Sequence, residues 1–91
     1  METEKRLIEE IEKWTKKIRK ELENMESASG KGDGFLKNIN AYVSDSDHFL
    51  KKSDLIRSFE AIVWAWAWLE IGKELCFLKK EYVSIGKDTG K

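Results

Sequence analysis

The sequence contains no proline, a single cysteine and no excess of either charge, because 17 Lys+Arg balance 17 Asp+Glu. Without proline, nothing in the chain forces a helix to break, which favours long uninterrupted helices. The lone Cys76 cannot form an internal disulfide, so disulfide scaffolds and metal-finger folds are excluded and a reducing cytoplasm is expected. Zero net charge argues against a protein dedicated to binding polyanions.

Long hydrophobic runs are also missing, since none approaches the roughly 18 residues that a transmembrane helix needs. The N-terminal METEKRLIEE lacks the apolar region of a signal peptide. Hydrophobic residues still make up 41% of the 91 residues, which is too many for a disordered chain. We therefore expect one cytoplasmic domain over residues 1–86, with a small core, and a disordered tail at 87–91.

The first predicted helix covers about residues 3–26. Its apolar residues recur at steps of three and four, which places them on one narrow stripe of an amphipathic helix. The stripe consists of Leu7, Ile11, Trp14, Ile18, Leu22 and Met25. Residues 27–34 contain three glycines at alternating positions and no apolar anchor, so they are predicted to form a flexible connection.

The second predicted helix covers about residues 35–52, and the third covers 54–85. Ser53 or Asp54 is the predicted N-cap of the third helix, so the connection between the two is very short. A connection of this length makes the two helices an antiparallel hairpin. The fold class expected from the whole pattern is an all-α, up-and-down bundle of three helices.

The third helix carries two apolar stripes that lie about 180° apart on a helical wheel. The first stripe is predicted to pack in the core. The predicted core residues are Phe49, Phe59, Ile62, Trp66 and Leu69. The second stripe would pack against the first helix or against a partner, or the third helix would bend near Gly72. It contains Trp64, Trp68, Ile71, Leu75, Leu78, Tyr82 and Ile85.

No catalytic, cofactor or metal site is expected. Asp45, Asp47 and His48 point in diverging directions on a helix, whereas a helical metal pair needs i, i+4 spacing. Cys76 has no histidine partner, which favours a small packing residue over a nucleophile. The glycines of residues 30–34 do not follow a strand, so they do not match a phosphate-binding loop.

Four lysines, Lys13, Lys16, Lys17 and Lys20, lie on the outer face of the first predicted helix. Such a cluster would contact a polyanion, because phosphate affinity rises with each neutralised charge. Several glutamates flank the cluster and dilute its field. A solvated helix face is therefore the favoured interpretation.

A continuous block of about a third of the chain, residues 42–75, resembles a family of small archaeal proteins designated domain of unknown function 357. The resemblance rests on Tyr42, Asp45, Ser46, Phe49, Leu50, Asp54, Phe59, Glu60, Ala61, Trp64, Ala65, Leu69 and Gly72. Ser53 stands in place of a turn glycine, which suggests a cap instead of a left-handed turn, and Ser58 in place of an alanine. The resemblance implies a three-helix bundle and an archaeal cytoplasmic source, but no activity.

The function predicted from these patterns is that of a non-enzymatic helical interaction module. It would form a homodimer or bind a protein partner through the interaction face Trp64, Trp68, Ile71, Leu75 and Leu78, because exposed apolar patches rich in Trp mark interfaces. The alternative is an accessory protein that binds RNA or a nucleotide enzyme through the lysines of the first helix. The sequence favours neither a membrane nor nucleic acid as the partner.

Overall fold

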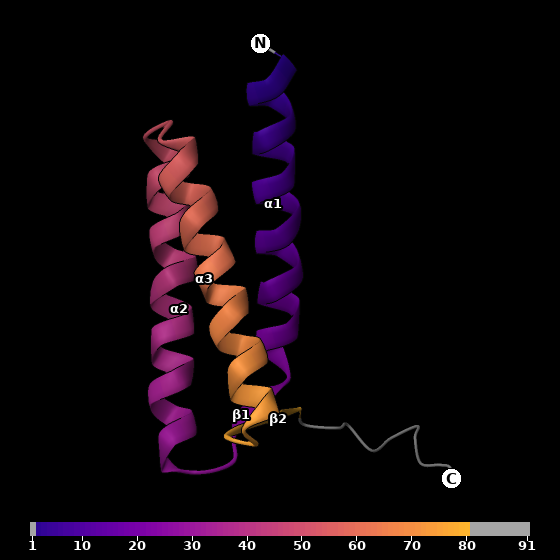
Figure 1. The fold of residues 1–91 in the computed structure, drawn as a ribbon, viewed down its shortest axis with the longest axis vertical. Coiled ribbons are helices and arrows are strands. Elements are labelled where there is room, and N and C mark those ends of the chain that lie inside the picture. The colour runs from indigo at the N-terminus through magenta and orange to yellow at the C-terminus, as the bar shows by residue number, and fades with distance from the viewer. Residues whose placement is uncertain (1, 81–91) are drawn as a thin grey trace, which may run out of the picture.

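The computed structural model describes residues 2–80 as three helices and a two-stranded ribbon. The elements in chain order are α1 (Glu2–Glu23), β1 (Met25–Ser27), α2 (Gly30–Lys51), α3 (Leu55–Glu74) and β2 (Leu78–Lys80). The chain runs down through α1, up through α2 and down again through α3 (Figure 1). The predicted up-and-down three-helix architecture is confirmed.

The bundle is a flat slab, with extents of 50 × 28 × 18 Å. In this slab α3 packs against both α1 and α2, whereas α1 and α2 contact each other little (Figure 1). One side of α3 therefore faces the other two helices. None of the helices within residues 2–80 combines the length and the apolarity needed to cross a bilayer.

The glycine-rich segment predicted as a flexible connection is instead the first part of α2, which begins at Gly30. Within this helical segment Gly32 lies against the ribbon, because a Cβ at this position would collide with the Phe77 carbonyl oxygen and with Ser27. The Gly32 N–H donates to the Ser29 carbonyl oxygen at 2.9 Å. Glycine therefore allows close packing here, and the flexible connection was a wrong prediction.

The ribbon joins the ends of α1 and α3, two segments far apart in the chain. β1 and β2 are antiparallel, with Met25 opposite Lys80 and Ser27 opposite Leu78. Just beyond the strands, the Ala28 N–H donates to the Phe77 carbonyl oxygen at 2.8 Å. Met25, predicted at the end of the first helix, therefore lies in a strand, and α1 ends at Glu23.

The third helix ends at Glu74 and does not continue to residue 85. Cys76 adopts a left-handed conformation with φ of 63°. Its N–H donates to the Lys73 carbonyl oxygen at 3.1 Å, and the Phe77 N–H donates to that of Gly72 at 2.9 Å. This pair of bonds is a Schellman motif, which satisfies the last carbonyls of the helix and turns the chain back. Tyr82 and Ile85 lie outside the described residues.

A substitution at Cys76 tests this helix end. A side chain in the left-handed region costs about 1–2 kcal/mol, so Cys76→Gly should raise the free energy of unfolding by up to about 1 kcal/mol after glycine's own entropy cost. Cys76→Val should lower the free energy of unfolding, because β-branched residues strongly disfavour positive φ. Urea denaturation of the two variants measures both effects, and equal stability would contradict the assigned conformation.

The α2–α3 turn repeats the same motif. Ser53 has φ of 62°, its N–H donates to the Leu50 carbonyl oxygen at 3.0 Å, and the Asp54 N–H donates to that of Phe49 at 2.9 Å. Ser53 therefore occupies the left-handed turn that we expected it to avoid. Asp54 is the N-cap of α3, because its carboxylate accepts from the Arg57 N–H at 3.2 Å.

The face of α3 that packs in the core consists mainly of small residues. Its buried members are Ser58, Ala61, Ile62, Ala65, Leu69 and Gly72. Ser58 and Ser46 show how close α2 and α3 come: the Ser46 hydroxyl donates to the Ser58 carbonyl oxygen at 2.9 Å, and the Ser58 hydroxyl donates to that of Ser46 at 2.8 Å. Both serines are fully buried, so each hydroxyl needs this partner.

This small-residue face changes which large residues reach the core. Ile62 and Leu69 are buried, while Phe49 and Trp66 are half-buried. Phe59 is 37% exposed, so its predicted place in the core is wrong. Because Ser58 faces α2, the next residue, Phe59, is rotated about 100° away from that helix and stays partly exposed.

Candidate interaction surfaces

The large hydrophobic residues that remain exposed in the described part of the chain all belong to α3 or its C-cap. They are Ile56, Phe59, Val63, Trp64, Ile71 and Leu75. α3 is therefore apolar around most of its circumference, a pattern typical of a helix that is buried on every side. Within residues 2–80, α1 and α2 cover only one of those sides.

The first surface, which we name the outer face, consists of Trp64, Ile71 and Leu75. Their exposed fractions are 54%, 42% and 53%. The spacing of seven and four residues places the three side chains on one stripe of α3. These are three of the five residues predicted for the interaction face.

The other two predicted members lie elsewhere. Leu78 is only 3% exposed and belongs to the core cluster, because the turn after α3 places it against Gly72. A Cβ on Gly72 would lie 2.6 Å from a Leu78 methyl carbon. Trp68 is half-buried against the core, with its ring edge-on to Phe35 at 5.3 Å. The assignment of Leu78 to an exposed face is therefore wrong, and Trp68 contributes only part of its ring.

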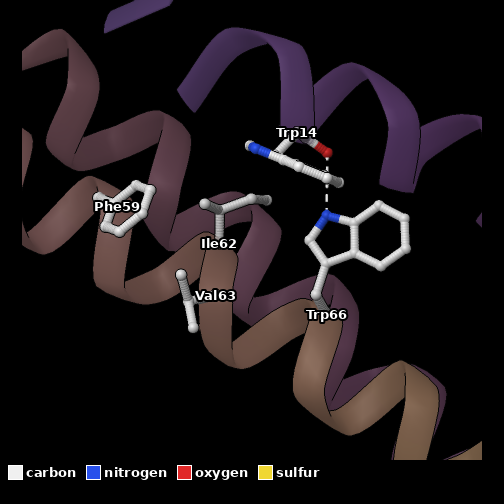
Figure 2. A pocket seen from close by; sticks show the side chains of 5 residues that line it. All are labelled: Trp14, Phe59, Ile62, Val63 and Trp66. Atoms are coloured by element: carbon white, nitrogen blue, oxygen red, sulfur yellow. Dashed lines mark hydrogen bonds between the residues drawn. The ribbon is translucent and has the colours of Figure 1, made fainter. Parts of the chain in front are cut away.

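The second surface is an apolar pocket of about 370 Å³ between α1 and α3. It is lined by Trp14, Phe59, Ile62, Val63 and Trp66, of which only Trp14 comes from α1 (Figure 2). The two indole rings are packed edge to face, with their centroids 5.7 Å apart. Trp66 Nε1 donates to the Trp14 carbonyl oxygen at 3.1 Å. Trp14 Nε1 donates to a Glu10 carboxylate oxygen at 3.0 Å. Both indole N–H groups are thus already bonded.

The four predicted lysines lie on one side of α1, because they are spaced three or four residues apart, but their ammonium groups have different surroundings. Lys13 and Lys17 lie over the Trp14 ring, with Nζ at 5.4 and 4.9 Å from its centroid, and Lys13 also pairs with Glu10 at 3.7 Å. Lys16, one helical turn from Lys20 on the same side of α1, lines a separate concavity that also contains the Arg19–Asp47 ion pair.

Lys17 and Lys20 line a third concavity, of about 410 Å³. Its other lining residues are Glu21, Asn24, Trp66 and Lys80. The carboxylate of Glu21 pairs with two ammonium groups. One oxygen accepts from Lys80 Nζ at 3.4 Å, and the other lies 3.8 Å from Lys73 Nζ. This second oxygen is buried and forms no hydrogen bond within the described residues. The concavity is therefore cationic.

The family model DUF357, described as a protein of unknown function, matches residues 6–78. The chain belongs to the DUF357 family. A solved structure of the family, the crystal structure of protein AF1782 from Archaeoglobus fulgidus, is 46% identical, with a TM-score of 0.78 over 86% of this chain and 97% of that one. No curated protein matches this DUF357 chain.

The remaining candidates form no joint site in this DUF357 protein. Asp47 pairs with Arg19 of α1, and His48 lies edge-on to the Phe49 ring at 5.5 Å. Cys76 is exposed at the end of α3. Among residues 2–80, no group of three or more His, Cys, Asp and Glu residues is arranged to hold a metal ion.

The pocket and the cationic concavity were not predicted from the sequence. Trp14 and Trp66 lie on two predicted core stripes, and nothing local shows that they meet with space beside them. A helical wheel does place Val63 next to Phe59 and Trp66, at i+4 and i−3. Lys80 joins Lys17 and Lys20 only through the ribbon, a long-range pairing.

Proposed function

We propose that this DUF357 protein is a non-enzymatic interaction module that forms a homodimer through the outer face. The observation that supports the proposal most directly is the exposure of Trp64, Ile71 and Leu75 on one stripe of a helix that is apolar around its circumference. Burying such side chains is favourable by about 25 cal/mol per Å² of apolar surface. Trp is also enriched at the centres of interfaces.

The size of this side of α3 is compatible with a small interface. The helix has 20 residues, so it is about 30 Å long at 1.5 Å per residue. With a diameter of about 10–12 Å including side chains, the helix alone would bury roughly 300–360 Å² per copy. Neighbouring side chains of the bundle would supply the rest of the roughly 600 Å² per copy at the lower end of specific interfaces. A two-fold axis would bring the same stripe of each copy into contact.

The double variant Ile71→Lys/Leu75→Lys should be monomeric, because four lysines would be placed in the dimer interface without partners. Both positions are exposed in the monomer, so helical content and the melting temperature of the monomer should change little. Size-exclusion chromatography with light scattering gives the mass, and circular dichroism gives the helical content.

The control variant Asn38→Lys/Ser44→Lys adds the same charge to exposed positions of α2 and should remain dimeric. If this control were monomeric, the loss of the dimer would be due to the added net charge and not to the position of the lysines on the outer face. A dimeric Ile71→Lys/Leu75→Lys protein would contradict the proposed interface. Loss of the helical signal in that variant would place the outer face in the monomer core.

A further inference from the structure

We propose that the groove between α1 and α3 binds an acidic amphipathic helix of a partner protein, independently of the outer face. The groove consists of the apolar pocket and the cationic concavity described above. The two adjoin at Trp66, which lines both, and Lys17, which lines the concavity, lies over the Trp14 ring of the pocket. One end of the groove is therefore apolar and the other carries positive charge.

The apolar end fits a large hydrophobic side chain. Its lining is entirely aromatic and aliphatic, and the volume of about 370 Å³ lies within the range of small binding pockets. Because Trp14 Nε1 and Trp66 Nε1 are already bonded to Glu10 and to the Trp14 carbonyl, neither is available to a polar ligand. The lining side chains therefore offer no hydrogen bond that would recognise the polar edge of a nucleobase.

The cationic end fits carboxylates. Lys17, Lys20 and Lys80 surround it, and the one carboxylate present, that of Glu21, already pairs with Lys80 and Lys73. Two ammonium groups, those of Lys17 and Lys20, form no ion pair within residues 2–80. An approaching carboxylate could therefore pair with either ammonium group without displacing a carboxylate of this chain, and such attraction also accelerates association.

The distance between the apolar end and the cationic end of the groove determines the residue spacing that a partner helix needs. Lys20 follows Trp14 by six residues on α1, a distance of about 9 Å along the helix axis. On a helix lying in the groove, this distance separates a hydrophobic anchor from acidic residues by one to two turns. For a partner helix that runs in the same direction as α1, the expected pattern is a large apolar residue followed by Glu or Asp at i+4 and i+7, which is helix-in-groove recognition.

The test uses two fluorescein-labelled synthetic peptides with strong helix propensity. The first carries a Phe anchor with Glu at i+4, i+7 and i+8, and the second has Lys at those three positions. Fluorescence anisotropy should show that the wild-type protein binds the Glu peptide more tightly than the Lys peptide. The variant Lys17→Glu/Lys20→Glu should bind the Glu peptide at least about tenfold more weakly, because it reverses both charges.

Two controls isolate the groove. Lys37→Glu/Lys51→Glu makes the same change of charge at exposed positions of α2, outside the groove lining, and should bind the Glu peptide as the wild type does. The Ile71→Lys/Leu75→Lys protein should also retain binding, whether or not the wild type is a dimer. Equal binding of both peptides, or no binding of either, would overturn the proposal. So would preferential binding of a single-stranded RNA oligonucleotide, or loss of the dimer in the Lys17→Glu/Lys20→Glu variant.

Discussion

Replacing Leu78 with lysine should unfold the protein. Leu78 is 3% exposed within the core cluster and packs on Gly72, so the new ammonium group would be buried without a partner. Burying an unpaired charge costs several kcal/mol, which is comparable with the total stability of about 5–10 kcal/mol expected for a domain of this size. Circular dichroism of Leu78→Lys should show a weak helical signal and no cooperative melting transition.

Leu75→Lys is the matched control for this substitution. Leu75 lies only three residues before Leu78 but is 53% exposed, so the variant should melt cooperatively. The contrast between the two positions depends on the turn at Cys76. If Leu78→Lys melted as Leu75→Lys does, the ribbon would not pack against α3 in solution.

Trp66→Ala should lower the free energy of unfolding by about 3 kcal/mol, near the lower end of the cost of truncating a buried Trp. The half-buried ring contributes an edge-to-face contact with Trp14 and a hydrogen bond to the Trp14 carbonyl oxygen. Such an aromatic pair contributes about 0.5–1.5 kcal/mol and the bond about 1 kcal/mol. These contacts join α1 to the α2–α3 hairpin, so their loss should loosen α1 first.

Trp66→Phe separates the two contributions, because it keeps an aromatic ring and removes the N–H donor. Its stability in urea denaturation should lie between those of the wild type and Trp66→Ala. A loss of less than about 1 kcal/mol in Trp66→Ala, within the range of surface substitutions, would show that α1 is held by other contacts.

Local sequence patterns were sufficient to predict the three helices and their order. The steps of three and four along α1 place Ile11 and Ile18 in the core, where both are fully buried. Asp54 was recognisable as a cap because a carboxylate before an apolar run satisfies the first N–H groups of a helix. These features depend on residues that are close in the chain.

The identity of the core face of α3 was harder to predict, because hydrophobic patterning favours large residues. The helix instead packs Ser58, Ala61 and Ala65 against α2, where small side chains permit a close approach. Phe59 is rotated away from α2 as a consequence and lines the pocket between α1 and α3. Two stripes of large residues on one helix were therefore a sign of exposed surface as well as of core.

The end of α3 was not predictable from local signals. The left-handed residue at a helix end is usually glycine. Here it is Cys76 after α3, as it is Ser53 after α2. Leu75 and Leu78 continue the helical spacing, so the apolar stripe gives no sign of the turn between them. The ribbon depends on pairing between Met25 and Lys80, which lie far apart in the chain, so no local sequence pattern predicts it.

The mass of the wild-type protein in solution, measured by light scattering over a range of concentrations, tests the central claim most directly. Burial of the outer face in a two-fold interface predicts a mass that rises with concentration to twice the 10.6 kDa of one chain. It should not rise further, because an isologous interface closes on itself. A mass that remains at 10.6 kDa up to the highest concentration reached would contradict self-association through α3.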